Sequence, residues 1–226
     1  MRLLILPAII AIAAPMANAQ KELQPAVELK TTQDKVSYAL GLNIGRQFQS
    51  QGLKVKPSMI AAGIQAILAD TEPALTPQQI QEAFTTYQAE IAAENMQAAK
   101  DFLEKNKQKE GVITTKTGMQ YTVLKEGTGK KPTTQDTVST HYRGMLLNKK
   151  VFDESYKGEA PTSADEPVSF GVTQVIAGWT EALQLMKTGA KYRLFIPPEL
   201  AYGERGPAGI GPNSLLIFDI ELLSIK

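Results

Sequence analysis

The sequence contains no cysteine and only one histidine, His141, among its 226 residues. Without cysteine the chain forms no disulfide and has no thiolate to act as nucleophile or metal ligand. A single histidine leaves only one possible base for a serine-type triad and excludes a two-histidine metal site within one chain. No G-x-S-x-G motif is present either. A hydrolase is therefore not expected, and stability must come from packed apolar area.

Neither sign of charge is in excess. Lys and Arg number 24 against 23 Asp and Glu, so the formal net charge is +1, and no long block of basic residues occurs. A nucleic-acid partner or an anionic membrane surface is therefore not expected.

The first residues are typical of a signal peptide. The apolar run Leu3–Ala14 contains Pro7 and is shorter than the roughly 20 residues that a membrane span needs. It is followed by Ala17-Asn18-Ala19, an A-x-A cleavage signal. We therefore expect a signal peptide at residues 1–19, no membrane span, and an exported mature chain that begins at Gln20.

Helical spacing characterises the first part of the mature chain. Between residues 31 and 52 apolar side chains recur every four positions, at Val36, Leu40, Ile44 and Phe48. Thr31 and Asp34 resemble a capping box at the start of this helix. A second, short helix is predicted after Pro57 by the apolar residues Ile60, Ile64, Ile67 and Leu68. Gly41 and Gly45 lie four apart in the first helix, and we expect another helix to approach closely there.

A long third helix is predicted to follow. Thr76, Pro77 and Gln79 supply an N-cap, a proline at the first helical position and a capping-box glutamine, and no proline or glycine comes before Gly111. Such a helix is about 50 Å long. We expect its first half, which carries Ile80, Phe84, Tyr87 and Ile91, to be buried. The second half, rich in lysine, is expected to be mainly a solvated spacer.

Three helices of this size make a thin core for independent stability. We therefore predict that residues 20–75, with the first half of a connecting helix at residues 76–110, form a helical dimerisation module. The alternative is a monomer whose helices pack on the C-terminal domain.

From residue 111 to residue 226 the pattern changes to short strands separated by glycine and proline clusters. Strands are predicted at Gln120–Leu124, Thr137–Leu147, Val168–Phe170, Tyr192–Ile196 and Leu215–Ile225, with one helix at Gly178–Lys187. These elements predict an α+β fold in which an antiparallel sheet wraps on a short helix. A pocket can then lie between the helix and the sheet.

Four segments of this region, in order and in register, resemble the FKBP family of peptidyl-prolyl cis-trans isomerases. They are His141–Gly144 with Val151–Ser155, then Val175–Trp179, then Pro197–Gly203, and finally Leu216–Leu223. The layout of the whole chain resembles the dimeric periplasmic or surface FKBPs of Gram-negative bacteria, the macrophage-infectivity-potentiator group. The resemblance implies isomerisation of X-Pro bonds in unfolded or partly folded polypeptides, inhibition by rapamycin-like macrolides, a homodimer and chaperone activity. It favours the periplasm, with the outer surface as the alternative.

The same resemblance implies the site residues. It makes Tyr142, Phe152 and Phe218 the aromatic walls and Trp179 the floor, facing outward into a cleft. Val168 stands where many members have an aromatic residue, which implies a slightly more open wall. Val175 and Ile176 line the side, Tyr202 and Ile210 close the rim, and Asp153 lies at the edge. The Ile176 N–H and the Tyr202 hydroxyl are the implied donors to substrate carbonyls. For each aromatic residue core packing is the alternative.

Three neighbours of these residues are interpreted differently. For Phe170 we prefer core packing, and His141 is expected to be structural because it lies on the opposite face of its strand. The family's aspartate is often supported by an arginine in the next loop, but residues 154–166 contain none, and Lys157 is the expected substitute. The loop at residues 154–167 is also several residues longer than in minimal members of the family.

Rotation about an X-Pro bond requires no nucleophile, metal or other cofactor, and we expect none. Two other functions remain open. One is a dimeric chaperone or binding module for unfolded proteins with little isomerase activity. The other is a structural or adhesion protein at the cell surface.

Overall fold

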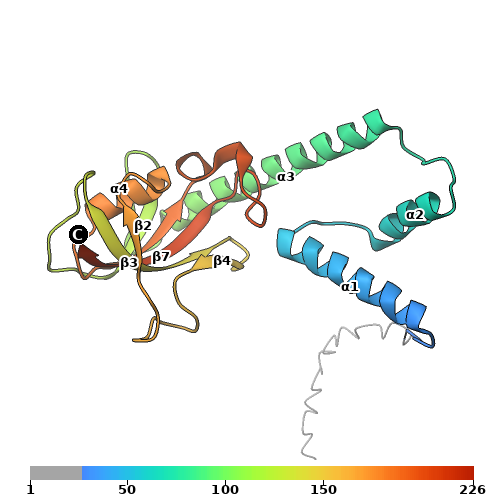
Figure 1. The fold of residues 1–226 in the computed structure, drawn as a ribbon. Coiled ribbons are helices and arrows are strands. Elements are labelled where there is room, and N and C mark those ends of the chain that lie inside the picture. The colour runs from blue at the N-terminus through green and yellow to red at the C-terminus, as the bar shows by residue number, and fades with distance from the viewer. Residues whose placement is uncertain (1–26) are drawn as a thin grey trace, which may run out of the picture. The chain divides into compact units, whose positions relative to one another are not determined.

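The computed structural model describes residues 27–226, so the predicted signal peptide lies outside the described residues. The chain divides into two compact units, one ending at Ile44 and the other comprising Gly45–Lys226. Three helices come first (Figure 1): α1 (Thr32–Gln51), α2 (Pro57–Leu68) and α3 (Pro77–Asn106). All three were predicted from the sequence and are confirmed. Within residues 27–226 no helix combines the length and the apolar character that crossing a membrane requires.

Two helices begin with the expected capping boxes. Before α1, the Asp34 carboxylate accepts a hydrogen bond from the Thr31 N–H at 2.8 Å, and the Thr31 hydroxyl accepts one from the Asp34 N–H at 3.1 Å. Hydrogen bonding to its carboxylate, first from the Thr31 backbone N–H and then from the Thr31 side chain, holds the pKa of Asp34 below its usual value. Before α3, the Gln79 side-chain oxygen accepts a hydrogen bond from the Thr76 N–H at 2.9 Å, and the Thr76 hydroxyl accepts one from the Gln79 N–H at 3.3 Å. Each box satisfies two N–H groups that the first helical turn leaves without partners.

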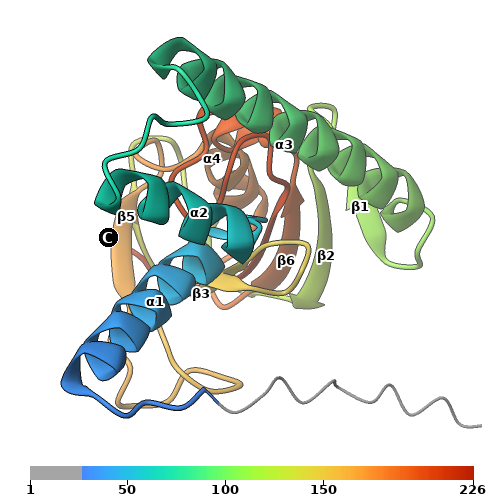
Figure 2. The ribbon, with the colours of Figure 1, turned by 90° about the vertical axis from the view of Figure 1, so that its right-hand side faces the viewer.

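The second half of α3 is not the solvated spacer that the sequence suggested. Ala99 and Asn106 are each only 1 % exposed, and the Phe102 ring lies 5.5 Å from the ring of Phe195 in the sheet. The Asn106 amide donates to the side-chain oxygen of Gln120 at 3.0 Å. Figures 1 and 2 show this half of the helix running alongside the sheet. The prediction was wrong because it rested on the many lysines of this half. A few buried residues on one helical face are enough to attach the helix to the sheet.

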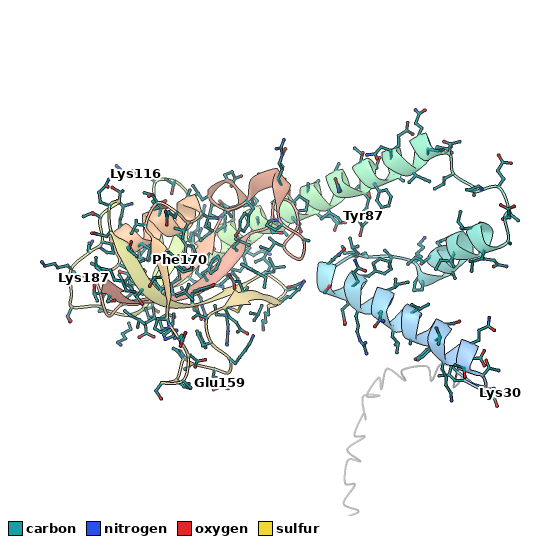
Figure 3. The ribbon with its side chains drawn as sticks, in the orientation of Figure 1. Lys30, Tyr87, Lys116, Glu159, Phe170 and Lys187 are labelled. Atoms are coloured by element: carbon teal, nitrogen blue, oxygen red, sulfur yellow. The ribbon has the colours of Figure 1, made fainter. Side chains whose placement is uncertain are left out.

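The first half of α3 also differs from expectation, since two of its apolar residues are not buried within the single chain. Phe84 is 63 % exposed and Ile80 is 41 % exposed. Tyr87, labelled in Figure 3, is partly buried, and its hydroxyl accepts a hydrogen bond from the Lys54 N–H at 2.9 Å.

Seven strands form a single sheet in the second unit. They are β1 (Val112–Thr114), β2 (Gln120–Lys125), β3 (Thr137–Met145), β4 (Val151–Glu154), β5 (Val168–Gly171), β6 (Lys191–Ile196) and β7 (Leu216–Ile225). The order is β1-β2-β6-β7-β3-β4, with β5 also paired to β3, and every pairing is antiparallel. The five predicted strands are confirmed, and β1 and β4 are additional.

The core of this domain lies between the sheet and α4 (Ala177–Leu185). Along β7 buried residues alternate with partly exposed ones, so one face of the strand lines the core. Gly178 allows α4 to approach the sheet closely, because a Cβ there would lie 2.5 Å from the side chain of Ile196. After β6, short 3-10 turns at Pro198–Leu200 and Gly203–Arg205 carry the chain across the end of the sheet. The α+β fold class is confirmed.

Candidate functional site

Four aromatic side chains meet where α4 packs against β3, β4 and β7. The Trp179 ring lies edge-on to Tyr142, with centroids 5.3 Å apart, and edge-on to Phe218 at 5.2 Å. Phe152 lies edge-on to Phe218 at 5.5 Å. Near-perpendicular contacts of this kind set the positive edge of one ring against the negative face of the next. We call Tyr142, Phe152, Trp179 and Phe218 the aromatic cage.

A glycine on β3 makes room for the cage. Gly144 lies two residues after Tyr142, on the same face of the strand. A Cβ at Gly144 would lie 2.6 Å from the Phe218 ring and 2.7 Å from the Phe152 ring, so only glycine lets these rings meet above the strand. Gly144 ends the His141–Gly144 motif, and no role was predicted for it. The signal that could have found it is its spacing from Tyr142.

The floor of the cage is more enclosed than the sequence suggested. The expectation that Trp179 faces outward was wrong, since the residue is 4 % exposed. Its indole N–H is buried and has no hydrogen-bond partner among residues 27–226. The backbone N–H of Ile176, at the start of α4, likewise has no acceptor within the described chain. A hydrogen-bond donor left without a partner beside apolar side chains costs free energy. A ligand carbonyl oxygen that accepts a hydrogen bond from such a donor is therefore held strongly.

One polar contact links the cage to its edge. The Tyr142 hydroxyl donates to the Asp153 carboxylate at 2.9 Å. Tyr142 is 7 % exposed, whereas Asp153 is exposed. Burial, and secondly the bond to Asp153, raise the pKa of the Tyr142 hydroxyl well above its usual value. Tyr142 therefore stays neutral and remains a donor over the whole physiological pH range.

The rim opens into a cavity of about 600 Å³ beside the cage. Phe152, Asp153, Tyr202 and Ile210 are among the residues that line it. Tyr202 is 42 % exposed. Three further side chains pack beside the cage against the same core, Val168, Val175 and Ile176. Each of the ten residues selected from the sequence thus belongs to the cage, lines this cavity or packs against the core.

Lys157 does not support Asp153, so that expectation was wrong. The Lys157 ammonium lies 2.5 Å from one oxygen of Glu154, and the Arg143 guanidinium donates to the other at 2.9 Å. The hydrogen bond from Lys157, and to a lesser extent that from Arg143, lower the pKa of the Glu154 carboxyl. The partner of Asp153 that sequence reasoning missed is the Tyr142 hydroxyl. This contact forms only when β3 and β4 pair in the sheet.

The remaining neighbours divide between structural and site positions. His141 lies 3.2 Å from the Ser155 hydroxyl, a contact that agrees with a structural role. Phe170 packs against the core, as expected. Its ring also contacts the cage, at 5.5 Å from that of Trp179 and 5.8 Å from that of Tyr142. Figure 3 shows Phe170 inside the sheet domain, while Glu159 projects from it on the loop between β4 and β5.

Comparisons with known proteins agree with this geometry. Residues 128–223 match the family described as FKBP-type peptidyl-prolyl cis-trans isomerase, and residues 33–123 match the domain amino terminal to it. The chain is 39 % identical over 213 residues to the outer membrane protein MIP of Legionella longbeachae, covering 89 % of each chain. It is 37 % identical to the peptidyl-prolyl cis-trans isomerase Mip of Coxiella burnetii, covering 89 % of this chain and 90 % of the relative. The crystal structure of FkpA from Escherichia coli matches with a TM-score of 0.58 at 38 % identity, over 88 % of this chain and 99 % of that one.

Proposed function

Because the chain belongs to the FKBP-type peptidyl-prolyl cis-trans isomerase family, we propose that the aromatic cage and its rim are where it rotates X-Pro bonds. The chain is a peptidyl-prolyl cis-trans isomerase, and its substrates are proline-containing polypeptides. The observation that carries the assignment of the site is the cage itself. Three aromatic walls stand around the buried floor that Trp179 forms. The indole N–H of Trp179 and the backbone N–H of Ile176 have no partner within residues 27–226.

The cage favours the twisted form of the bond. Resonance makes the C–N bond partly double and sets a barrier of about 18–20 kcal/mol. At the top of this barrier the resonance is lost and the amide is less dipolar than in the planar forms. Apolar walls that exclude water therefore disfavour the planar amide more than the twisted one. A millionfold acceleration corresponds to about 8 kcal/mol, shared between desolvation and orientation.

Three groups orient the substrate in this proposal. The Ile176 N–H and the Tyr202 hydroxyl hold carbonyl oxygens on either side of the prolyl ring, which rests on Trp179. Asp153 acts through Tyr142, because the hydrogen bond between them sets the orientation of that wall of the cage. A bound segment held at two carbonyls loses little further freedom as the bond twists.

The test is a protease-free isomerisation assay with a proline-containing peptide, followed by NMR exchange. We expect Tyr202→Phe to lower kcat/KM by about two- to tenfold, the range for one lost hydrogen bond. Asp153→Ala should lower it similarly, and a rapamycin-like macrolide should block the wild type. The control is Tyr121→Phe, a Tyr on β2 stacked on Tyr192. Full activity in both site variants would show that the reaction takes place elsewhere on the chain.

We further propose that the chain is a homodimer, with residues 20–75 and the first half of α3 as the dimerisation module and residues 111–226 as the isomerase domain. α1 and α2 contain no buried residue. The apolar residues of α2 with the largest exposed fractions are Met59 at 64 %, Ile67 at 69 % and Leu68 at 82 %. A Cβ placed at Gly41 or Gly45 would have no atom of residues 27–226 within 4 Å, which leaves room for a close helix there. A second copy supplies both contacts.

Sedimentation of residues 20–226 tests the dimer. We expect the mass of two chains for the wild type and of one chain for Ile67→Glu or Phe84→Glu, because each change introduces a charge into an apolar contact. The matched control is Gln81→Glu on α3, an exposed position. A wild type that sediments with the mass of one chain at all concentrations would contradict the proposal.

Export and binding of unfolded chains complete the proposed function. We propose that residues 1–19 direct the chain to the periplasm, with the outer surface as the alternative. Chaperone activity is favoured by an apolar cavity of about 1020 Å³ whose lining includes Leu53, Phe84 and Ile91. Suppression of aggregation should then survive Asp153→Ala, which separates it from isomerase turnover.

A further inference from the structure

The loop that carries the rim of the cage is folded back on itself. This rim loop, residues 203–214, follows Tyr202 and includes Ile210. The Asn213 N–H donates to the Gly203 carbonyl at 2.8 Å and joins the two ends of the loop. The Ser214 hydroxyl donates to the Ile210 carbonyl at 2.7 Å. The loop is therefore closed by its own backbone, and a movement of one end displaces Ile210.

Helix α3 holds this loop from a distant part of the sequence. The Asn95 side-chain amide donates to the Pro212 carbonyl at 2.7 Å and lies 3.4 Å from the Ser214 hydroxyl. In the opposite direction, the Asn213 amide donates to the Ala92 carbonyl at 3.4 Å. Asn213 is 8 % exposed and has a φ of 49°, a conformation that asparagine and glycine adopt most readily. Two asparagines thus link the loop and the helix in both directions.

The helix itself is a fixed support for the loop. Its C-terminal half is attached to the sheet by the bond from Asn106 to Gln120, both of which are buried, and by the contact of Phe102 with Phe195. A buried, fully paired amide contact resists displacement because breaking it leaves polar groups without partners. The position of Asn95 relative to the sheet is therefore determined by packing further along the same helix.

We propose that Asn95 is a positioning residue for prolyl isomerisation. Through Pro212 and Ser214 it holds the rim loop so that Ile210 closes the side of the cavity, and it thereby sets the affinity for substrate and the preference for the residues that flank proline. The proposal rests on the placement of the prolyl site at the cage. When a loop is in its binding conformation for only a fraction of the time, the apparent dissociation constant rises by the inverse of that fraction.

The variants are chosen to separate the hydrogen bond from packing. Asn95→Ala removes the amide, and Asn95→Asp keeps its shape but places a carboxylate against the Pro212 carbonyl. Asn213→Gly permits the same positive φ while removing the contact to Ala92. The matched control is Gln97→Ala, two residues further along α3, because the Gln97 amide donates to Asp101 on the same helix at 2.8 Å.

The measurements are KM and kcat for a series of peptides that differ in the residue before proline, and the dissociation constant of a rapamycin-like macrolide. Loss of one hydrogen bond should raise KM and the macrolide constant by about two- to tenfold in each of the three variants. We expect a smaller change in kcat. The differences in KM among the peptides should also become smaller than in the wild type. Asn95→Asp should raise KM and the macrolide dissociation constant at least as much as Asn95→Ala does, although its side chain fills the same space as that of Asn95.

Two results would overturn the proposal. If all three variants remain folded by Trp179 fluorescence and match Gln97→Ala in KM, macrolide affinity and preference, Asn95 does not position the loop. Macrolide binding by Ile210→Ala then separates the positioning role of Asn95 from the place of Ile210 at the rim. If Ile210→Ala binds the macrolide more weakly, the prolyl site stays where it is placed and only the role of Asn95 is refuted. If Ile210→Ala binds the macrolide as the wild type does, both the place of Ile210 at the rim and the positioning role of Asn95 are refuted.

Discussion

Replacing Tyr142 by phenylalanine removes the hydroxyl that donates to Asp153 while keeping the ring against Trp179 and Phe218. A hydrogen bond to a charged group contributes about 1.5–3 kcal/mol, and less where water can replace the donor. Because Asp153 is exposed, we expect Tyr142→Phe to lower the free energy of unfolding of the isomerase domain by about 1 kcal/mol near neutral pH.

The same substitution should become favourable in alkali. Burial and the bond to Asp153 raise the pKa of Tyr142 in the folded chain above the ordinary value of 10.0. Below that pH the tyrosine is neutral in both states, and its contribution to stability is complete. Above it the unfolded chain ionises while the folded chain does not, so the wild type loses up to about 1.4 kcal/mol per pH unit. Phenylalanine has no such loss, and the two proteins should reach equal stability near about pH 11.

The assay is urea unfolding at about pH 7 and about pH 11, followed by the fluorescence of Trp179. It is the only tryptophan of the chain, and its ring lies 5.3 Å from that of Tyr142. Tyr121→Phe serves as the control, since any change that it shares with Tyr142→Phe is not specific to the cage. If Tyr142→Phe is less stable than the wild type by the same free energy of unfolding at both pH values, the reasoning is refuted.

Two further substitutions test contacts around the site. Gly144→Ala should destabilise the isomerase domain by about 1–3 kcal/mol and weaken macrolide binding, because its Cβ would lie within 2.7 Å of two cage rings; wild-type values in urea unfolding and calorimetry would contradict the steric argument. Asn106→Ala should lower the free energy of unfolding by about 1–3 kcal/mol, because it leaves the buried side-chain oxygen of Gln120 without its donor; hydrogen exchange on β2 measures the effect. Unchanged exchange there would mean that α3 is attached by its apolar contacts alone.

Features set by neighbours in the sequence were predictable. The capping boxes at Thr31 and Thr76 and the starts of α1 and α3 depend on residues three positions apart, and both were confirmed. The five strands followed from short runs bounded by glycine and proline. The family followed from four motifs whose order and spacing are themselves properties of the sequence, and the comparisons show the same family.

Features that depend on which segments meet in space were decided by the tertiary structure. The lysine-rich half of α3 packs on the sheet because a few positions on one helical face match it, and composition averages over both faces. Tyr142 bonds to Asp153 because strand pairing brings β3 beside β4. Lys157 bonds instead to Glu154, three residues before it in the sequence. The sequence by itself determined the local elements and the type of chemistry. Only the fold decided polar contacts such as those of Asn95 with Pro212 and of Tyr142 with Asp153, since their partners lie on other elements and are selected by packing.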